Sequence, residues 1–430
     1  MTKQPKRLKA QMWDKMQYLF RNYYDRMLHV RIDFDGMLDI AALKEAYNYM
    51  LERVPVLHSR FHNNFIKPYW SVKKIDIDSI VTLKQYSDPA KAERAANEAL
   101  IREIPAQSDA QIRVTVVRCG GKDIMIQLLN HMCMDGGDTK SFVKSLSKVY
   151  SDIVAGRTPD APVKTGDRSH WQLYTGFDEE KRKVAKGLYK NVSRVKDKIK
   201  FPFVKGGELK PHVVVKRCDE EFFDKLKAYS KSIGATINDI ILAAYIRELY
   251  KITGMDKDRP LGVPCMVDLR RYIDIKDSYG YSNHVGFMIS RVDRLDDDPK
   301  VTALKVKANS EENKADPYMG LYALPLLNLA YTIFPQFISE PAISLGYDNP
   351  YTGLSNIGLI ADGDANFGPL KTVDLYITGA IKKKPYMQLS LYTFRKKITF
   401  TIAVTCSEED RRIICSFLDG ILDELYNIIA

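Results

Sequence analysis

The passage from Ile112 to Ala155 constrains the fold of this chain more than any other stretch. Residues 112–117 alternate as a strand, Gly120–Gly121 supply a turn, and residues 124–129 form a second strand that is apolar on both faces. A strand of that kind is expected at the centre of a sheet. The apolar stripe that follows predicts a helix to about Ala155, with Asp138 as its N-cap. The passage therefore predicts a layered α/β structure.

The same style of pattern recurs along the chain. Helical periodicity is present at residues 38–53, 222–232, 236–250 and 409–429, and strand patterns at residues 213–215 and 366–405, the latter with basic turns at residues 382–384 and 395–397. A length of 430 residues is too great for one small core. We expect an N-terminal half at residues 1–178, a basic helix and linker at residues 179–211, and a C-terminal half at residues 212–430.

The basic linker carries much of the charge of the chain. Residues 181–217 hold 13 Lys or Arg against Asp197 and Glu208, so the segment has the same net charge, +11, as the entire protein. We expect a basic helix over residues 179–199. Such a segment is either a solvated face or a docking site for an anion: a nucleotide phosphate, an acidic carrier protein or an anionic membrane surface. No nucleic-acid recognition motif accompanies the charge, so we expect no nucleic acid partner.

The composition excludes several other classes of protein. Charged residues make up 28% of the chain and hydrophobic residues 45%, which is typical of globular proteins. The first 20 residues contain no apolar run of signal-peptide type, and we expect a cytoplasmic protein. No pair of cysteines has C-x-x-C spacing and no metal-ligand spacing occurs, so we expect reduced thiols and no metal site.

One segment is long enough to be considered as a membrane span. No charged residue occurs from Pro317 to Ser339. Pro325 and Pro335 interrupt a helix there, and polar side chains dilute the segment. We therefore expect no transmembrane span, and a core or substrate-lining segment instead.

The sharpest local feature is His131-Met132-Cys133-Met134-Asp135-Gly136, an H-x-x-x-D-G pattern. The spacing alone is weak evidence, because His29 and Asp33 also fit H-x-x-x-D. Context separates the two. His131 ends the predicted central strand, and Gly136-Gly137 open a helix, where side chains point into a crevice and backbone amides are free.

At these residues the chain resembles the chloramphenicol-acetyltransferase-like superfamily, and within it bacterial alcohol acetyltransferase-type proteins and the condensation domains of non-ribosomal peptide synthetases. The resemblance spans roughly residues 15–430 in the order of the family, through residues 38–61, 103–146, 234–249, 263–273 with Asn283, and 354–360. It implies an α/β fold of two similar halves, each a mixed sheet with flanking helices, which meet along a tunnel.

The implied chemistry is acyl transfer from a CoA thioester to a small alcohol or amine. The resemblance implies that the enzyme has no permanently bound cofactor and uses acyl-CoA as a co-substrate. His131 is the implied general base, because a neutral imidazole can take the proton of the attacking group. Asp135 resembles the aspartate that turns away from the substrate and pairs with an arginine, here Arg270 or Arg271. Gly136 lets the backbone approach the substrate.

The thioester carbonyl becomes an oxyanion and needs fixed donors. The candidates are the backbone N–H groups after Asp135, including that of Gly137, the Ser390 hydroxyl and Asn130. Asn130 is also a departure from the family, since condensation domains usually carry a second histidine at that position. The change weakens the condensation interpretation more than the catalytic one.

Three alternatives remain open. The first is a condensation-type enzyme whose acyl donor is bound to a carrier protein, which the basic linker could meet. The second is a non-catalytic family member that binds a ligand, which Asn130 favours. The third is an enzyme of lipid surfaces that binds vesicles through residues 181–217. The charge-free segment hints at a hydrophobic acceptor or acyl chain.

Overall fold

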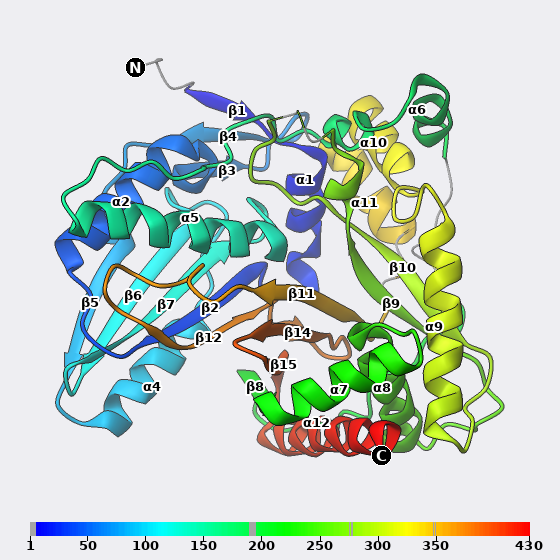
Figure 1. The fold of residues 1–430 in the computed structure, drawn as a ribbon. Coiled ribbons are helices and arrows are strands. Elements are labelled where there is room, and N and C mark those ends of the chain that lie inside the picture. Colours follow the sequence, from blue (N-terminus) through cyan, green and yellow to red (C-terminus); the bar gives the residue numbers. More distant parts are fainter. Residues whose placement is uncertain (1–5, 189–194, 275, 277, 347, 349) are drawn as a thin grey trace.

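The structure is a computed structural model that describes residues 6–188, 195–274, 276, 278–346, 348 and 350–430. Two lobes lie side by side, each built on a sheet with helices packed against it (Figure 1). This confirms the predicted mixed α/β fold of two halves. Each lobe has its own hydrophobic core, and a third apolar cluster joins the lobes at their seam, with contributions from α1 (Met12–Leu19) and α10 (Leu324–Ile333).

The first lobe contains a five-stranded sheet. Its strands are, in spatial order, β12 (Thr372–Thr378), β2 (Met27–Phe34), β7 (Lys122–Asn130), β6 (Ile112–Cys119) and β5 (Val81–Tyr86). The predicted second strand is β7, and its central place is confirmed. Gly120 and Gly121 join β6 to β7 with φ values of 57° and 74°, which glycine adopts without strain.

The second lobe contains a seven-stranded sheet. Its strands are β10 (Val285–Val292), β9 (Leu261–Asp268), β11 (Leu354–Ile360), β14 (Leu389–Phe394), β15 (Lys397–Cys406) and β13 (Lys382–Lys383), with β8 (Lys210–Cys218) paired to β15. A small sheet of β1 (Arg7–Lys9), β4 (Tyr69–Val72) and β3 (Ser59–His62) lies beside the first lobe. The turn predicted at residues 382–384 is in part wrong, because Lys382 and Lys383 pair with β15 as a short strand.

The two halves exchange a strand. β12 follows β11 in the chain, yet it pairs antiparallel with β2, with Thr378 opposite His29 (Figure 1). The C-terminal half thus completes the first sheet. The residue boundaries of the domains stay a prediction.

Helices flank both sheets (Figure 1). The remaining helices that precede β8 are α2 (Ile40–Arg53), α3 (Ile77–Ile80), α4 (Pro89–Leu100), α5 (Gly136–Val154) and α6 (Glu179–Lys186). Those that follow it are α7 (Glu220–Ser232), α8 (Ile237–Thr253), α9 (Pro299–Ala315), α11 (Gln336–Gly346) and α12 (Glu408–Ile429).

The N-cap of α5 differs from the prediction. The Asp135 carboxylate accepts a hydrogen bond of 2.9 Å from the backbone N–H of Asp138, so Asp135 caps the helix and Asp138 lies in its first turn. Both residues fit the sequence pattern of a cap. The Asp138 carboxylate is instead buried and bonded to residues outside the helix.

The basic helix predicted over residues 179–199 is shorter than expected. α6 ends at Lys186, and residues 195–199 are not helical. Residues 189–194 of the predicted helix lie outside the described residues. Only Ala185 of α6 is buried, so there is little packing to extend the helix past Gly187.

The charge-free segment forms parts of two short helices. Pro325 lies in the first turn of α10, and Pro335 separates α10 from α11. None of the helices in the described part of the chain combines the length and the apolar character needed to cross a membrane.

Candidate active site

His131 follows the last residue of the central strand β7 and faces a cavity between the lobes. Its backbone N–H donates to the carbonyl of Arg26 at 2.7 Å, which fixes the start of the loop that leads to α5. The side chain is partly exposed and lines a cavity of about 750 Å³. Both lobes contribute to the cavity wall, including Gly136 from the first and Asn283 from the second.

The other histidine with the same spacing does not reach this cavity. His29 lies within β2 and is fully buried. Its Nδ1 lies 2.5 Å from the carbonyl oxygen of Leu100, and its Nε2 lies 3.0 Å from a carboxylate oxygen of Asp25. This arrangement is that of a structural histidine.

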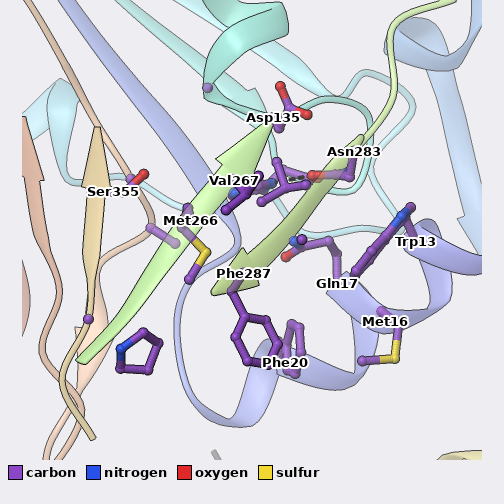
Figure 2. A pocket seen from close by; sticks show the side chains of 18 of the residues that line it. Trp13, Met16, Gln17, Phe20, Asp135, Met266, Val267, Asn283, Phe287 and Ser355 are labelled. Carbon is purple, nitrogen blue, oxygen red and sulfur yellow. Dashed lines mark hydrogen bonds between the residues drawn. The ribbon is translucent and has the colours of Figure 1, made fainter. Parts of the chain in front are cut away.

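Asn283 fixes the tautomer of His131. The Asn283 amide Nδ2 donates to the His131 carbonyl at 2.6 Å, so the Oδ1 of the same amide is the acceptor. That Oδ1 lies 2.8 Å from the His131 Nδ1, which must therefore carry the ring proton. In the neutral ring the lone pair is then on Nε2. Figure 2 shows Asp135 and Asn283 at one end of the view, with Val267 beside them, and the apolar side chains of Phe20, Met16 and Phe287 at the other.

The environment favours a neutral His131. Burial lowers the pKa of His131 below its ordinary value. The Asp135 charge raises this pKa and the Lys382 charge lowers it, and the net direction is downward. His131 is therefore unprotonated at neutral pH and can accept a proton.

The Asp135 carboxylate forms a buried ion pair with Arg270. The Arg270 Nη2 donates to both Asp135 carboxylate oxygens, at 3.0 and 2.9 Å, and the backbone N–H of His284 donates to Oδ2 at 2.8 Å. Burial alone would raise the pKa of Asp135, but the Arg270 charge and the hydrogen bonds hold it below the ordinary value. The carboxylate thus stays charged and ties the loop to the second lobe.

Asp138 extends this network. Its carboxylate lies 2.8 Å from Arg270 and 2.7 Å from Lys164, and it accepts the backbone N–H of Ser282 at 2.7 Å. The two carboxylates at the start of α5 therefore hold this loop against Arg270, Ser282 and His284 of the other lobe. Arg271 has a different position: its side chain is exposed and its guanidinium lies 5.5 Å from the centroid of the Tyr272 ring.

The first turn of α5 borders the cavity. Gly136 and Gly137 line the cavity and are the first two residues of α5. The backbone N–H groups of the first four residues of a helix have no acceptor within the helix. A Cβ on Gly137 would lie 3.4 Å from both Arg270 Nη1 and Asp135 Oδ1, so a methyl group there would make van der Waals contact with the buried pair. Ser390, on β14, also lines the cavity, opposite Ser355 of β11.

Asn130 is not brought to the cavity. It is fully buried, its Nδ2 donates to Gln111 Oε1 at 2.7 Å, and its Oδ1 accepts the backbone N–H of Met132 at 3.0 Å. These bonds shape the turn after β7. They leave Asn130 a structural place in the loop that carries His131.

Two cationic residues that the sequence patterns did not single out belong to the site. Arg168 donates to the carbonyls of Met132 and Cys133, at 3.4 and 3.3 Å, and to Asp14 at 2.9 Å, so it holds the loop from behind. Lys382 lines the cavity with its Nζ 3.9 Å from the centroid of the Tyr24 ring. Burial lowers the pKa of Lys382 to about 8. Lys382 appears in the sequence only as part of a basic turn, and no local signal distinguishes it.

Among the described residues, no three His, Cys, Asp or Glu side chains gather into a group that could hold a metal ion.

Known proteins resemble this chain in sequence and in fold. The family model described as "Condensation domain" matches residues 9–281. A probable non-canonical nonribosomal peptide synthetase, CymA, from Salinispora arenicola (strain CNS-205) is 25% identical over 261 residues, which is 56% of this chain and 3% of CymA. The chain spans only 3–6% of the length of the curated relatives it matches.

Solved structures share the fold along nearly the entire chain. Polyketide synthase associated protein 5 from Mycobacterium tuberculosis superposes with a TM-score of 0.69 at 15% identity, over 98% of each chain. The TRI3 trichothecene 15-O-acetyltransferase from Fusarium sporotrichioides gives a TM-score of 0.71 at 12% identity, over 98% of this chain and 95% of TRI3. At these identities the likeness concerns the fold alone.

Proposed function

The chain belongs to the condensation-domain family, and from that premise we propose that it transfers an acyl group from a thioester to an alcohol or amine, with His131 as the general base. The observation that carries the proposal is the bond between His131 Nδ1 and Asn283, which leaves the Nε2 lone pair for proton transfer at the cavity. The lowered pKa of His131 supports the same role.

The proposed reaction has two steps. The acceptor oxygen or nitrogen forms a bond to the thioester carbonyl carbon while its proton passes to His131 Nε2. The tetrahedral oxyanion then collapses, the carbon–sulfur bond breaks, and the leaving thiolate takes the proton from the imidazolium. Proton transfer of this kind contributes roughly 10²- to 10⁴-fold to the rate.

The oxyanion is proposed to meet donors at the start of α5. The backbone N–H groups of Gly136 and Gly137 lie at the positive end of the helix dipole and border the cavity. The Ser390 hydroxyl on the cavity wall is the side-chain candidate. Asp135 and Arg270 act indirectly, because they fix the loop between the base and these amides.

We propose a CoA thioester as the acyl donor, with a carrier-protein thioester as the alternative. Both present an acyl group on the same phosphopantetheine arm, so the chemistry at His131 is common to them. The match to a condensation-domain model and to peptide synthetases favours the carrier-bound donor. The fold does not separate the two donors, because an O-acetyltransferase and condensation domains share it. The apolar lining residues Met16, Phe20 and Phe287 fit a hydrophobic acyl chain or acceptor.

The test compares donors directly. The purified chain is incubated with acetyl-, hexanoyl- and decanoyl-CoA and pooled alcohols and amines, and release of the free thiol is followed; the same acyl groups are then supplied on a phosphopantetheinylated carrier protein. Turnover with acyl-CoA supports the free donor. Turnover only with the acyl group bound to the carrier protein supports the alternative.

His131→Ala should lower either rate by roughly 10²- to 10⁴-fold. His62→Ala is the matched control, since His62 bonds to Ser71 in the small sheet and does not line the cavity. Transfer that is unchanged in His131→Ala would contradict the proposed base and favour a ligand-binding role.

A further inference from the structure

The surface formed by α10 and α11 is unusually apolar. Between residues 326 and 345, ten residues are exposed; nine of them are apolar, the tenth is Thr332, and none is charged. Exposed leucine, isoleucine and phenylalanine at this density are uncommon on a water-facing surface.

The two helices carry their apolar side chains outward. In α10 the exposed residues Leu326, Leu329 and Ile333 form one stripe. In α11 the arrangement is inverted relative to an ordinary surface helix: the polar Gln336 and Ser339 are buried, whereas Phe337 and Ile338 are 51% and 43% exposed. Water does not favour this orientation, which indicates that something apolar covers the surface.

A loop of the first lobe enlarges the same surface. Phe65 and Ile66 are 73% and 62% exposed, and their carbonyls accept the backbone N–H groups of Phe337 and Gln336 at 3.2 and 3.1 Å. The Phe65 and Phe337 rings lie 5.5 Å apart. We call these two residues, together with the exposed apolar residues from Leu326 to Leu345, the apolar face.

Positive charge borders the apolar face. Lys67 follows Ile66 directly, and Arg7 and Lys9 are exposed on β1, which pairs with β4 at the other end of the same loop. Lys15 connects these charges to α10, because its Nζ donates to the carbonyl of Tyr331 at 3.4 Å. Burial is the largest cause of the lowered pKa of Lys15, and the nearby charges of Lys9 and Lys67 lower this pKa further. We call Arg7, Lys9 and Lys67 the basic rim.

Acidic charge is neutralised at this surface. The one charged residue between Pro317 and Gly346 is Glu340, which forms a 2.6 Å ion pair with Arg21. An apolar surface bordered by lysine and arginine matches the interface of an anionic bilayer, where apolar acyl chains lie beneath negatively charged headgroups. A second copy of the chain would bring two basic rims together, which like charges oppose.

We propose that the apolar face and basic rim bind this protein to the surface of an anionic lipid membrane. The apolar side chains enter the boundary between headgroups and acyl chains, and the basic rim pairs with the lipid phosphates. The protein lies on the membrane and does not cross it.

The cavity opens toward this face. Leu326 and Ala342 are exposed on the apolar face and also line the cavity that contains His131. An apolar acceptor or acyl chain dissolved in lipid can therefore enter along α10 and α11 without crossing water. This last step rests on the proposed acyl transfer, whereas membrane binding does not.

The test measures co-sedimentation of the full chain with vesicles of phosphatidylcholine alone and of phosphatidylcholine with phosphatidylglycerol. We expect binding to the anionic vesicles that weakens as salt is raised. The double variant Phe337→Ser, Ile338→Ser should bind at least about tenfold more weakly, from the transfer free energy of two apolar side chains. Lys9→Glu and Lys67→Glu should each weaken binding about fivefold or more.

The matched control is Leu359→Ser with Val373→Ser, which removes two apolar side chains that are 63% and 58% exposed on β11 and β12, away from this face. It should bind as the unmodified protein does, and circular dichroism should show every variant folded. Absence of binding by the unmodified protein, or equal binding by Phe337→Ser, Ile338→Ser, would overturn the proposal. A dimer in light scattering that becomes a monomer in that variant would assign the face to a second copy and overturn it as well.

Discussion

At the scale of single residues, His131 and Asn283 form a pair in which each fixes the other. The two hydrogen bonds between them set the amide orientation and the imidazole tautomer together. Neither outcome follows from one residue alone, because a lone imidazole exchanges its proton between two nitrogens. A base with a fixed tautomer needs no reorientation before it accepts a proton.

The pH dependence of the proposed acyl transfer should show whether His131 acts as a neutral base. Only unprotonated His131 can accept the proton, so kcat/KM falls as pH drops through the His131 pKa. Burial lowers that pKa from 6.5, so we expect the acid limb to lie below pH 6.5. A pH series of kcat/KM with the productive donor from the donor comparison measures it, and a limb above 6.5 would contradict a buried neutral base.

Lys382 should tune this limb through its charge. A protonated Lys382 disfavours the imidazolium, so Lys382→Met removes the repulsion, raises the His131 pKa and moves the acid limb to higher pH. Lys383→Met is the matched control, since Lys383 is exposed on the adjacent position and bonds to the carbonyl of Arg21. Both profiles are measured as kcat/KM against pH. A limb that stays in place in Lys382→Met would show that the two charges do not interact.

At the scale of secondary-structure elements, the N-terminus of α5 is fastened to the second lobe. Asp135 caps the helix and at the same time accepts two bonds from Arg270, and Asp138 binds Arg270 and Lys164. The site loop therefore depends on a residue from η4 (Leu269–Tyr272), in the other half of the chain.

Loss of Arg270 should destabilise the protein strongly. Arg270→Met leaves two buried carboxylates without their shared cation, and we expect a loss of about 3–5 kcal/mol in the free energy of unfolding. Arg271→Met, one position away and exposed, should change it by less than about 0.5 kcal/mol. Urea unfolding of both variants measures the difference. Equal stability of the two would contradict the view that the network fastens the lobes.

The local part of the site was predictable from the sequence, and the tertiary part was not. The end of the strand before His131 and the start of the helix at Gly136 both follow from patterns in neighbouring residues. Asn283 lies 152 positions from its partner, and Lys382 reaches the cavity only because β13 pairs with β15. The resemblance predicted an arginine partner for Asp135 but did not decide between Arg270 and Arg271. The direction in which each of these side chains points depends on the tertiary fold.

At the scale of the whole molecule, a shared sheet and a buried ion network join the halves, in addition to the apolar cluster at the seam. β12 from the C-terminal half completes the sheet of the first lobe, and the Arg270 network joins the lobes beside the cavity. The cavity lies between the lobes that these contacts join. The proposed catalysis at this shared wall therefore requires that neither half unfold alone.

Unfolding should accordingly be a single cooperative transition. Trp70 lies in the core of the first lobe, whereas Trp13 packs against the apolar cluster at the seam, so tryptophan fluorescence reports the first lobe and the seam. Far-UV circular dichroism is dominated by helices of both lobes, including α8, α9 and α12. Because removing β12 exposes an edge of the first sheet, loss of the second lobe should destabilise the first. We expect the two probes to give the same urea midpoint and the same slope.

Arg270→Met should move both midpoints together to lower urea concentration, since it weakens the contact between the lobes and not one lobe. A fluorescence transition that separates from the dichroism transition in the unmodified protein would show that the lobes unfold independently, and the strand exchange would then be too weak to couple them.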